Sequence, residues 1–79
     1  MKDRKQWLLN QLVACGHRKF TLEKILITVS KNGHIVFIDK HDSRYELLTL
    51  DCVSGDLAGR GFLELEPAIV EMQNKLNKL

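Results

Sequence analysis

The chain has 79 residues, of which 44% are hydrophobic and 28% are charged, and its formal net charge is +2. This composition is typical of a small globular protein and excludes a disordered or fibrous chain. The chain is too short to build two hydrophobic cores, so we expect a single domain over residues 1–79. A chain of this size buries only roughly 60% of its unfolded surface, which makes a homodimer an option.

No apolar run approaches the roughly 18 residues that a membrane helix needs, so no membrane association is expected. The opening "MKDRKQWLLNQLVACG" is charged and then apolar. However, Asn10 and Gln11 interrupt the apolar stretch and no small-x-small cleavage site follows, so it does not predict a signal peptide. Cys15 and Cys52 form no CxxC pair and are too few for a disulfide scaffold. We therefore expect a cytoplasmic protein with reduced, buried thiols.

Charge is distributed unevenly along the chain. Residues 1–40 carry eight Lys or Arg against three Asp or Glu, whereas residues 41–79 carry four against seven. A basic patch built from the first half would suit an acidic partner such as nucleic acid. The alternative is that these side chains are simply the solvated surface of a helix end and a loop. The candidates for nucleic-acid contact are Lys2, Arg4, Lys5, His17, Arg18 and Lys19, together with Arg60.

Residues 2–15 are predicted to form a helix that Gly16 ends. An apolar face is expected from Leu8, Leu9, Leu12, Val13 and Cys15. Trp7 lies roughly 150° from the middle of that face, which is unusual because tryptophan is costly to leave in water. It either closes the edge of the core or contacts a partner.

A hairpin is predicted from "KILITVS" (24–30) and "HIVFIDK" (34–40), because Asn32-Gly33 between them suits a two-residue turn with positive φ. This turn pairs Lys31 with His34, and continuing the register pairs Ile25 with Lys40. One face then carries Ile25, Ile27, Val29, Val36 and Ile38, and the other carries Leu26, Thr28, Ile35 and Phe37. The second face is apolar enough for something to cover part of it.

After the turn "HDSR" (41–44), residues 45–53 are predicted to form a third strand, and "SGDLAGRG" (54–61) a glycine-rich loop. Residues 62–66 are either a short fourth strand or an extended lead into the last helix. Pro67 suits the first turn of that helix. Its apolar stripe is Ala68, Ile69, Met72, Leu76 and Leu79. The predicted fold is an α+β domain with a three-stranded antiparallel meander and both helices on the isoleucine-bearing face of the sheet.

No cluster of residues predicts a catalytic or cofactor site. His34 would need a carboxylate or a second histidine and a cleft to act in acid–base chemistry, and the hairpin places Lys31 opposite it. Cys15, His17, His41 and Cys52 lack the close pairs of structural zinc ligands, so no metal is expected. The "AGRG" segment lacks a Walker or Rossmann context, so no nucleotide is expected either.

The predicted order of elements, α-β-β-β-α, resembles the double-stranded-RNA-binding fold, which includes the HicA-type toxins that cleave messenger RNA. "KNGHIVF" is similar to the HicA segment in which a glycine and a histidine begin the second strand. The resemblance implies a catalytic role for His34. The chain departs from these families in lacking the G-T-L segment of HicA, and "FLELEPAIVEM" is acidic where true double-stranded-RNA binders carry lysines.

The absence of a catalytic cluster favours binding over turnover. The leading hypothesis is a small regulator or inhibitor, of the kind found on mobile elements, that binds another protein or itself through Trp7, Ile35 and Phe37 or through an exposed strand edge. Nucleic-acid binding through the basic residues is the alternative, and a HicA-like ribonuclease is a second one. No cofactor, metal or small-molecule substrate is expected.

Overall fold

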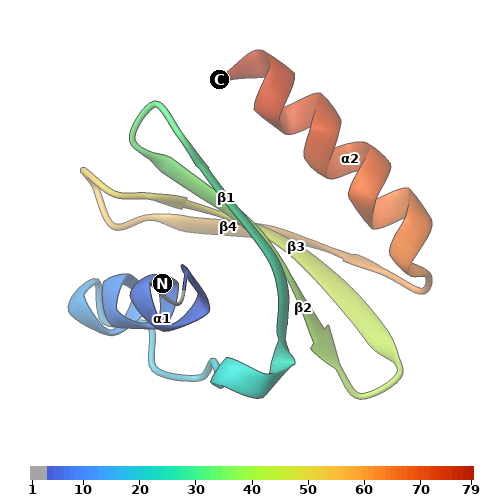
Figure 1. Ribbon diagram of the computed structural model, residues 1–79, viewed down its shortest axis with the longest axis horizontal. Helices are drawn as coiled ribbons and strands as arrows, with labels where there is room; N and C mark the ends of the chain where they lie inside the picture. Colours follow the sequence, from blue (N-terminus) through green and yellow to red (C-terminus); the bar gives the residue numbers. More distant parts are fainter. Residues whose placement is uncertain (1–3) are drawn as a thin grey trace.

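The fold is α+β, as the sequence predicts, but the meander has four strands (Figure 1). The computed structural model describes residues 4–79. The sheet is antiparallel in the order β1-β2-β3-β4, so each strand pairs with the next along the chain. The elements are α1 (Arg4–Ala14), a short 3-10 helix η1 (Leu22–Lys24), β1 (Ile25–Lys31), β2 (His34–His41), β3 (Arg44–Asp51), β4 (Leu57–Phe62) and α2 (Leu65–Lys78).

The end of α1 is set by Gly16, as predicted. Gly16 has φ +89°, a left-handed conformation that a glycine adopts without steric cost. Its N–H donates to Val13 O at 3.0 Å and the N–H of His17 donates to Leu12 O at 2.8 Å. This is the Schellman arrangement, and it satisfies carbonyls that would otherwise lack partners at the helix end.

The Asn32-Gly33 turn forms with positive φ at both residues, 51° and 78°. It gives the predicted pairing of Lys31 with His34, and that register holds as far as the pair of Ile27 with Ile38. Beyond it a β-bulge shifts the register, and Ile25 pairs with Asp39 instead of Lys40. The prediction for Ile25 was therefore wrong: the extra residue turns this side chain to the other face of the sheet.

The two helices lie on opposite faces of the sheet, which corrects the predicted packing on one face (Figure 1). On the first face, Leu8 and Leu12 of α1 pack in one core cluster with Ile35 and Phe37 of β2. On the second face, α2 packs on Val36 and Ile38 of the same strand, which join Leu47, Ala68 and Met72 in a separate cluster. Both faces of the sheet are apolar, and a single helix can cover only one of them. The sheet therefore needs a helix on each side.

Strand β4 occupies much of the stretch predicted to be a glycine-rich loop, and residues 63–66 lie beyond it. Gly59 pairs with Leu48 in the sheet, and a Cβ at this position would lie 2.7 Å from Leu48 Cδ2. A side chain here would therefore have to displace the end of the Leu48 side chain, so close packing rather than a turn favours a glycine. Glycine is a poor strand former, which explains why the sequence pattern pointed to a loop.

The C-terminal helix follows the predicted pattern. Pro67 lies in its first turn. Ala68 and Met72 are buried, and Ile69, Leu76 and Leu79 pack against the same cluster. Val13 of α1, in contrast, was predicted to be in the core and is 42% exposed.

Phe37 and Trp7 differ in what they contribute to stability. Phe37 is fully buried and its ring meets that of Phe20 edge to face at 5.5 Å, whereas Trp7 is 41% exposed. We expect Phe37→Ala to lower the free energy of unfolding by about 3–5 kcal/mol. Trp7→Ala should lower it by about 1 kcal/mol. Urea unfolding followed by circular dichroism measures both, and equal losses would contradict this assignment of core and surface.

Candidate functional site

The face of the sheet that α1 covers is apolar at one end and polar at the other. Following the core residues Ile35 and Phe37, the next two side chains of β2 on this face are Asp39 and His41. Glu46 of β3 pairs with Asp39, and Phe20 stands at the boundary, packed on Phe37. Charged side chains are thus held on rigid strands directly beside the hydrophobic core.

Two adjoining hollows lie over this polar end. One of about 160 Å³ is lined by Lys19, Phe20, Asp39, His41 and Glu46. The other, of about 200 Å³, is lined by His41, Arg44, Glu46 and Gly61. Because they share His41 and Glu46, we treat them as one depression, the β2–β3 groove, which reaches the edge strand at Gly61. A Cβ at Gly61 would lie 2.9 Å from Arg44 Nη2, so the guanidinium lies across this glycine.

Asp39 is the unusual group of the groove. It is 4% exposed, and its Oδ1 has no hydrogen-bond partner among the described residues. Burial raises its pKa from 3.8 to about 6, and the negative charge of Glu46 adds to the rise, while His41 acts in the opposite direction. A hydrogen bond with Glu46 also favours the protonated form of Asp39. The two carboxyl groups therefore share a site where both ionise only at a cost.

A second polar site surrounds His34 on the opposite face and at the opposite end of β2. Asp51 of β3 pairs with His34, and their side chains approach to 3.7 Å between Nε2 and Oδ2. His34 thus has the carboxylate neighbour that the sequence did not reveal. A hollow of about 240 Å³ beside it is lined by His34, Thr49, Lys75, Lys78 and Leu79.

The geometry of His34 and Asp51 is set mainly by the backbone. His34 Nδ1 lies 3.0 Å from Asn32 O, an arrangement in which the ring N–H donates to the carbonyl. The amides of Val53 and Ser54 donate to Asp51 Oδ1 at 2.9 and 3.2 Å. These two bonds are the main reason that the pKa of Asp51 lies below its usual value, and His34 adds a smaller effect.

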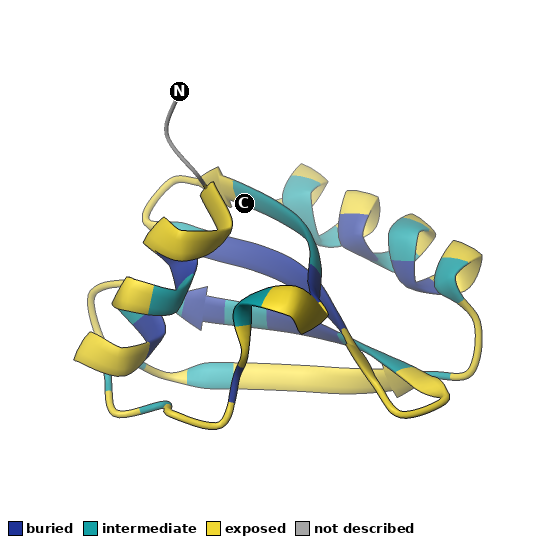
Figure 2. Ribbon diagram, turned by 60° about the horizontal axis from the view of Figure 1, so that its bottom comes forward, coloured by how far each residue is buried: buried dark blue, intermediate teal, exposed yellow. Residues whose placement is uncertain are grey.

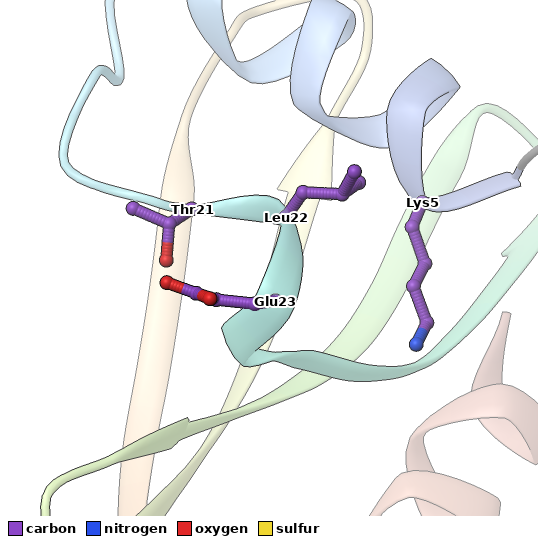
Figure 3. A pocket seen from close by; sticks show the side chains of 4 residues that line it. All are labelled: Lys5, Thr21, Leu22 and Glu23. Atoms are coloured by element: carbon purple, nitrogen blue, oxygen red, sulfur yellow. The ribbon is translucent and has the colours of Figure 1, made fainter.

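A larger hollow, about 550 Å³, lies between α1 and η1 (Figure 3). Its lining residues are Lys5, Thr21, Leu22 and Glu23. Figure 3 shows Leu22 directed toward α1, while the polar ends of Lys5 and Glu23 point in different directions. The charged groups do not converge on one point, so this hollow offers no arrangement for chemistry.

The predicted partner-binding residues separate into two groups. Ile35 and Phe37 are fully buried, so their assignment to an exposed contact surface was wrong. The apolar second face of the sheet is covered by α1 itself, which the order of elements did not reveal. Trp7 remains exposed on α1.

The predicted basic residues do not gather in one place. Lys2 lies outside the described residues. Arg4 and Lys5 begin α1, while Arg18 and Lys19 follow its far end, about 16 Å away along an 11-residue helix. Arg4 donates to Ser30 Oγ at 3.3 Å, and His17 Nε2 lies 2.8 Å from Gly55 O. Arg60 lies on β4, 5.1 Å from the centre of the Phe62 ring.

Within residues 4–79, no group of three or more metal-ligating side chains comes together. No helix of this region is long and apolar enough to cross a membrane. Both cysteines are free. Cys52 was predicted to be buried, but it is exposed because it lies in the turn between β3 and β4.

Comparisons of the chain with protein-family models, curated proteins and solved structures gave no match.

The β2–β3 groove was missed in the sequence although a signal existed. Asp39-x-His41 and Arg44-x-Glu46 place four polar side chains on alternate positions of two adjacent strands, around one turn. Alternation puts all of them on one face. In the sequence, the apolar Ile35 and Phe37 dominate this face, so the polar residues that follow them do not stand out.

The raised pKa of Asp39 predicts a specific dependence of stability on pH. Between the unfolded value near 3.8 and the folded value of about 6, the folded chain binds more protons, so this group destabilises the fold as pH rises through that interval. We expect the free energy of unfolding to fall by on the order of 2 kcal/mol more in wild type than in Asp39→Asn between pH 4 and pH 7.5. Urea unfolding of both proteins across this range measures the difference, and parallel curves would contradict it.

Proposed function

We propose that the chain is a non-enzymatic protein-binding module that docks an extended segment of its partner along β4. The observation that carries this proposal is the open edge of the sheet. Strand β4 pairs only with β3, and the residues from Ala58 to Gly61 are exposed, as Figure 2 shows for this strand. An edge of this kind presents unpaired main-chain N–H and C=O groups to which a further strand can be added.

The other edge of the sheet, β1, is better protected. The β-bulge after Ile25 interrupts it. At its far end, Arg4 of α1 donates to Ser30 Oγ, and Lys31 Nζ donates to Leu76 O of α2 at 2.7 Å. Both helices are thus attached to β1. Strand β4, in contrast, pairs with β3 without a bulge from Leu57 to Phe62.

Charge favours an acidic segment over a second copy of the chain. Arg60 is the one charged residue of β4 and lies near its middle, where two antiparallel copies would bring their arginines close together. An acidic residue in the added strand would instead pair with the Arg60 guanidinium. The partner segment that fits best is therefore extended and acidic at the position facing Arg60.

A peptide-display selection tests this docking mode. Selected peptides are expected to be extended and acidic, and chemical-shift changes should centre on residues 57–62. Methylating alternate backbone amides of a selected peptide, on its pairing edge only, should abolish binding because that edge then cannot donate. Arg60→Glu should weaken binding roughly tenfold or more, whereas Arg18→Glu, with the same change in net charge, should not.

Three outcomes would overturn the proposal: no selected peptide, tolerance of the methylated backbone, or equal losses for Arg60→Glu and Arg18→Glu. A selection that returns the chain's own β4 sequence would point to self-association instead. Sedimentation of the free chain checks that case independently, because a β4-mediated dimer would sediment at twice the mass of one chain in the absence of any peptide.

A second candidate, ribonuclease activity, is favoured by the surroundings of His34. Asp51 lies 3.7 Å from its ring, and Lys75 and Lys78 line the same hollow. In this function His34 takes the proton of a ribose 2′-hydroxyl, the resulting alkoxide attacks the adjacent phosphorus, and the 5′-oxygen leaves with a proton from water. The lysines would contact the phosphate. The resemblance of "KNGHIVF" to the HicA hairpin points to the same residue.

Cleavage of a fluorogenic single-stranded RNA tests this candidate. We expect His34→Ala to reduce the rate by about a hundredfold or more, since general-base catalysis typically contributes that much. Asp51→Asn should reduce it less, and His41→Ala, which removes the same side chain elsewhere on β2, should leave it unchanged. No cleavage by wild type, or an equal rate in His34→Ala, would eliminate it.

A further inference from the structure

We propose that the β2–β3 groove binds a guanidinium group that contacts the carboxyl groups of both Asp39 and Glu46. This site lies on the opposite face of the sheet from His34 and touches β4 only at Gly61, and the proposal does not depend on either function above. Its ligand chemistry is that of arginine, either as the free amino acid or as a side chain of another protein.

The first argument is the incomplete hydrogen bonding of Asp39. Buried carboxyl oxygens normally have hydrogen-bond partners, because a buried polar atom without one destabilises the fold. Asp39 is 4% exposed, and it lines the smaller hollow of the groove while its Oδ1 lacks a partner in the described chain. Rotation about Cβ–Cγ exchanges the two oxygens at little cost, so either can turn toward a ligand. The groove thus offers an acceptor that a bound donor would complete.

The second argument is the arrangement of the two carboxyl groups. Asp39 and Glu46 are directly opposite each other on adjacent strands. A planar guanidinium presents several N–H donors in fixed directions and can contact two carboxylates at once. The hollow that both residues line, about 160 Å³, also has Phe20 in its wall, and a guanidinium stacks well on an aromatic ring. His41 also lines this hollow, but among the described residues no group of three or more metal-ligating side chains comes together.

The cations already present define the rim of the site but do not fill it. Lys19 Nζ lies 5.5 Å from the centre of the Phe20 ring, and the Arg44 guanidinium lies across Gly61. No ion pair links either cation to Asp39 or Glu46 within residues 4–79. His41 lines both hollows of the groove as well.

Protonation of Asp39 supplies an independent signature of occupancy. Its pKa of about 6 reflects burial and the nearby Glu46, and His41, Lys19 and Arg44 are the other titratable groups around the groove. A guanidinium between the carboxyl groups favours the ionised form, so binding should release a proton near pH 6. Binding should therefore weaken by roughly tenfold between pH 7.5 and pH 5.

Titration with N-acetyl-arginine amide, followed by NMR chemical shifts and calorimetry, tests the proposal. We expect saturable shifts at Phe20, Asp39 and Glu46, and weakening of about ten- to a hundredfold in Asp39→Asn and Glu46→Gln. Asp56→Asn is the matched control, because it removes the same charge from the exposed turn between β3 and β4. This variant should bind N-acetyl-arginine amide as tightly as wild type does. N-acetyl-lysine amide should bind at least about tenfold more weakly.

Free arginine and an arginine-containing tripeptide with blocked ends distinguish the two sources. Tighter binding of the free amino acid indicates a small-molecule site, whereas tighter binding of the tripeptide indicates a side chain of another protein, and either result supports the proposal. Four outcomes would overturn it: no saturable shift in wild type, equal weakening by Asp56→Asn, equal affinity for the lysine compound, or affinity independent of pH. If Asp39→Asn does not fold, Glu46→Gln decides the same question.

Discussion

Strand β2 is buried on both of its faces, and the rest of the structure follows from that constraint. Its residues from Ile35 to Asp39 are all buried, which requires cover above and below the sheet. In a chain this short, each helix supplies one of those covers, so the two core clusters lie on either side of one sheet. The same alternation that sends Phe37 to α1 and Ile38 to α2 also carries Asp39 to the α1 face, at the point where α1 no longer covers it.

The β-bulge in β1 adapts that edge strand to a sheet with two covered faces. Leu26 and Ile27 both pack toward the α2 cluster, while Ile25 turns to the α1 cluster and becomes fully buried. A bulge increases the local twist and leaves a residue outside regular pairing. It therefore serves two purposes in this fold: it places Ile25 under α1, and it makes the β1 edge a poor template for another strand. Strand β4 has no such device, so the two edges of one sheet are unequal.

Local chemistry was predictable from the sequence, whereas tertiary arrangement was not. The Asn32-Gly33 turn, the Gly16 helix end and the apolar stripe of α2 each depend on residues close together in the chain, and each was found as predicted. The face that α1 occupies, the bulge after Ile25 and the strand at Gly59 depend on contacts between distant segments. For Gly59 the deciding contact is with Leu48, which no local pattern contains. The site residues divide in the same way: Asp39 and Glu46 were readable as neighbours only once both strands and their face were known.

The polar sites of β2 lie at its two ends and on its two faces, and this separation has a physical reason. The buried middle of the strand excludes charge, so titratable groups are tolerated only where a helix ends or a turn begins. His34 stands at the first end, where its backbone partner Asn32 and the strand neighbour Asp51 fix its ring. Asp39 stands near the other end but one step inside the core, where a carboxyl group is costly and its replacement by an apolar side chain would be easy to accommodate. Burial alone therefore does not account for a carboxyl at that position, whereas the guanidinium proposed for the groove would pair with it.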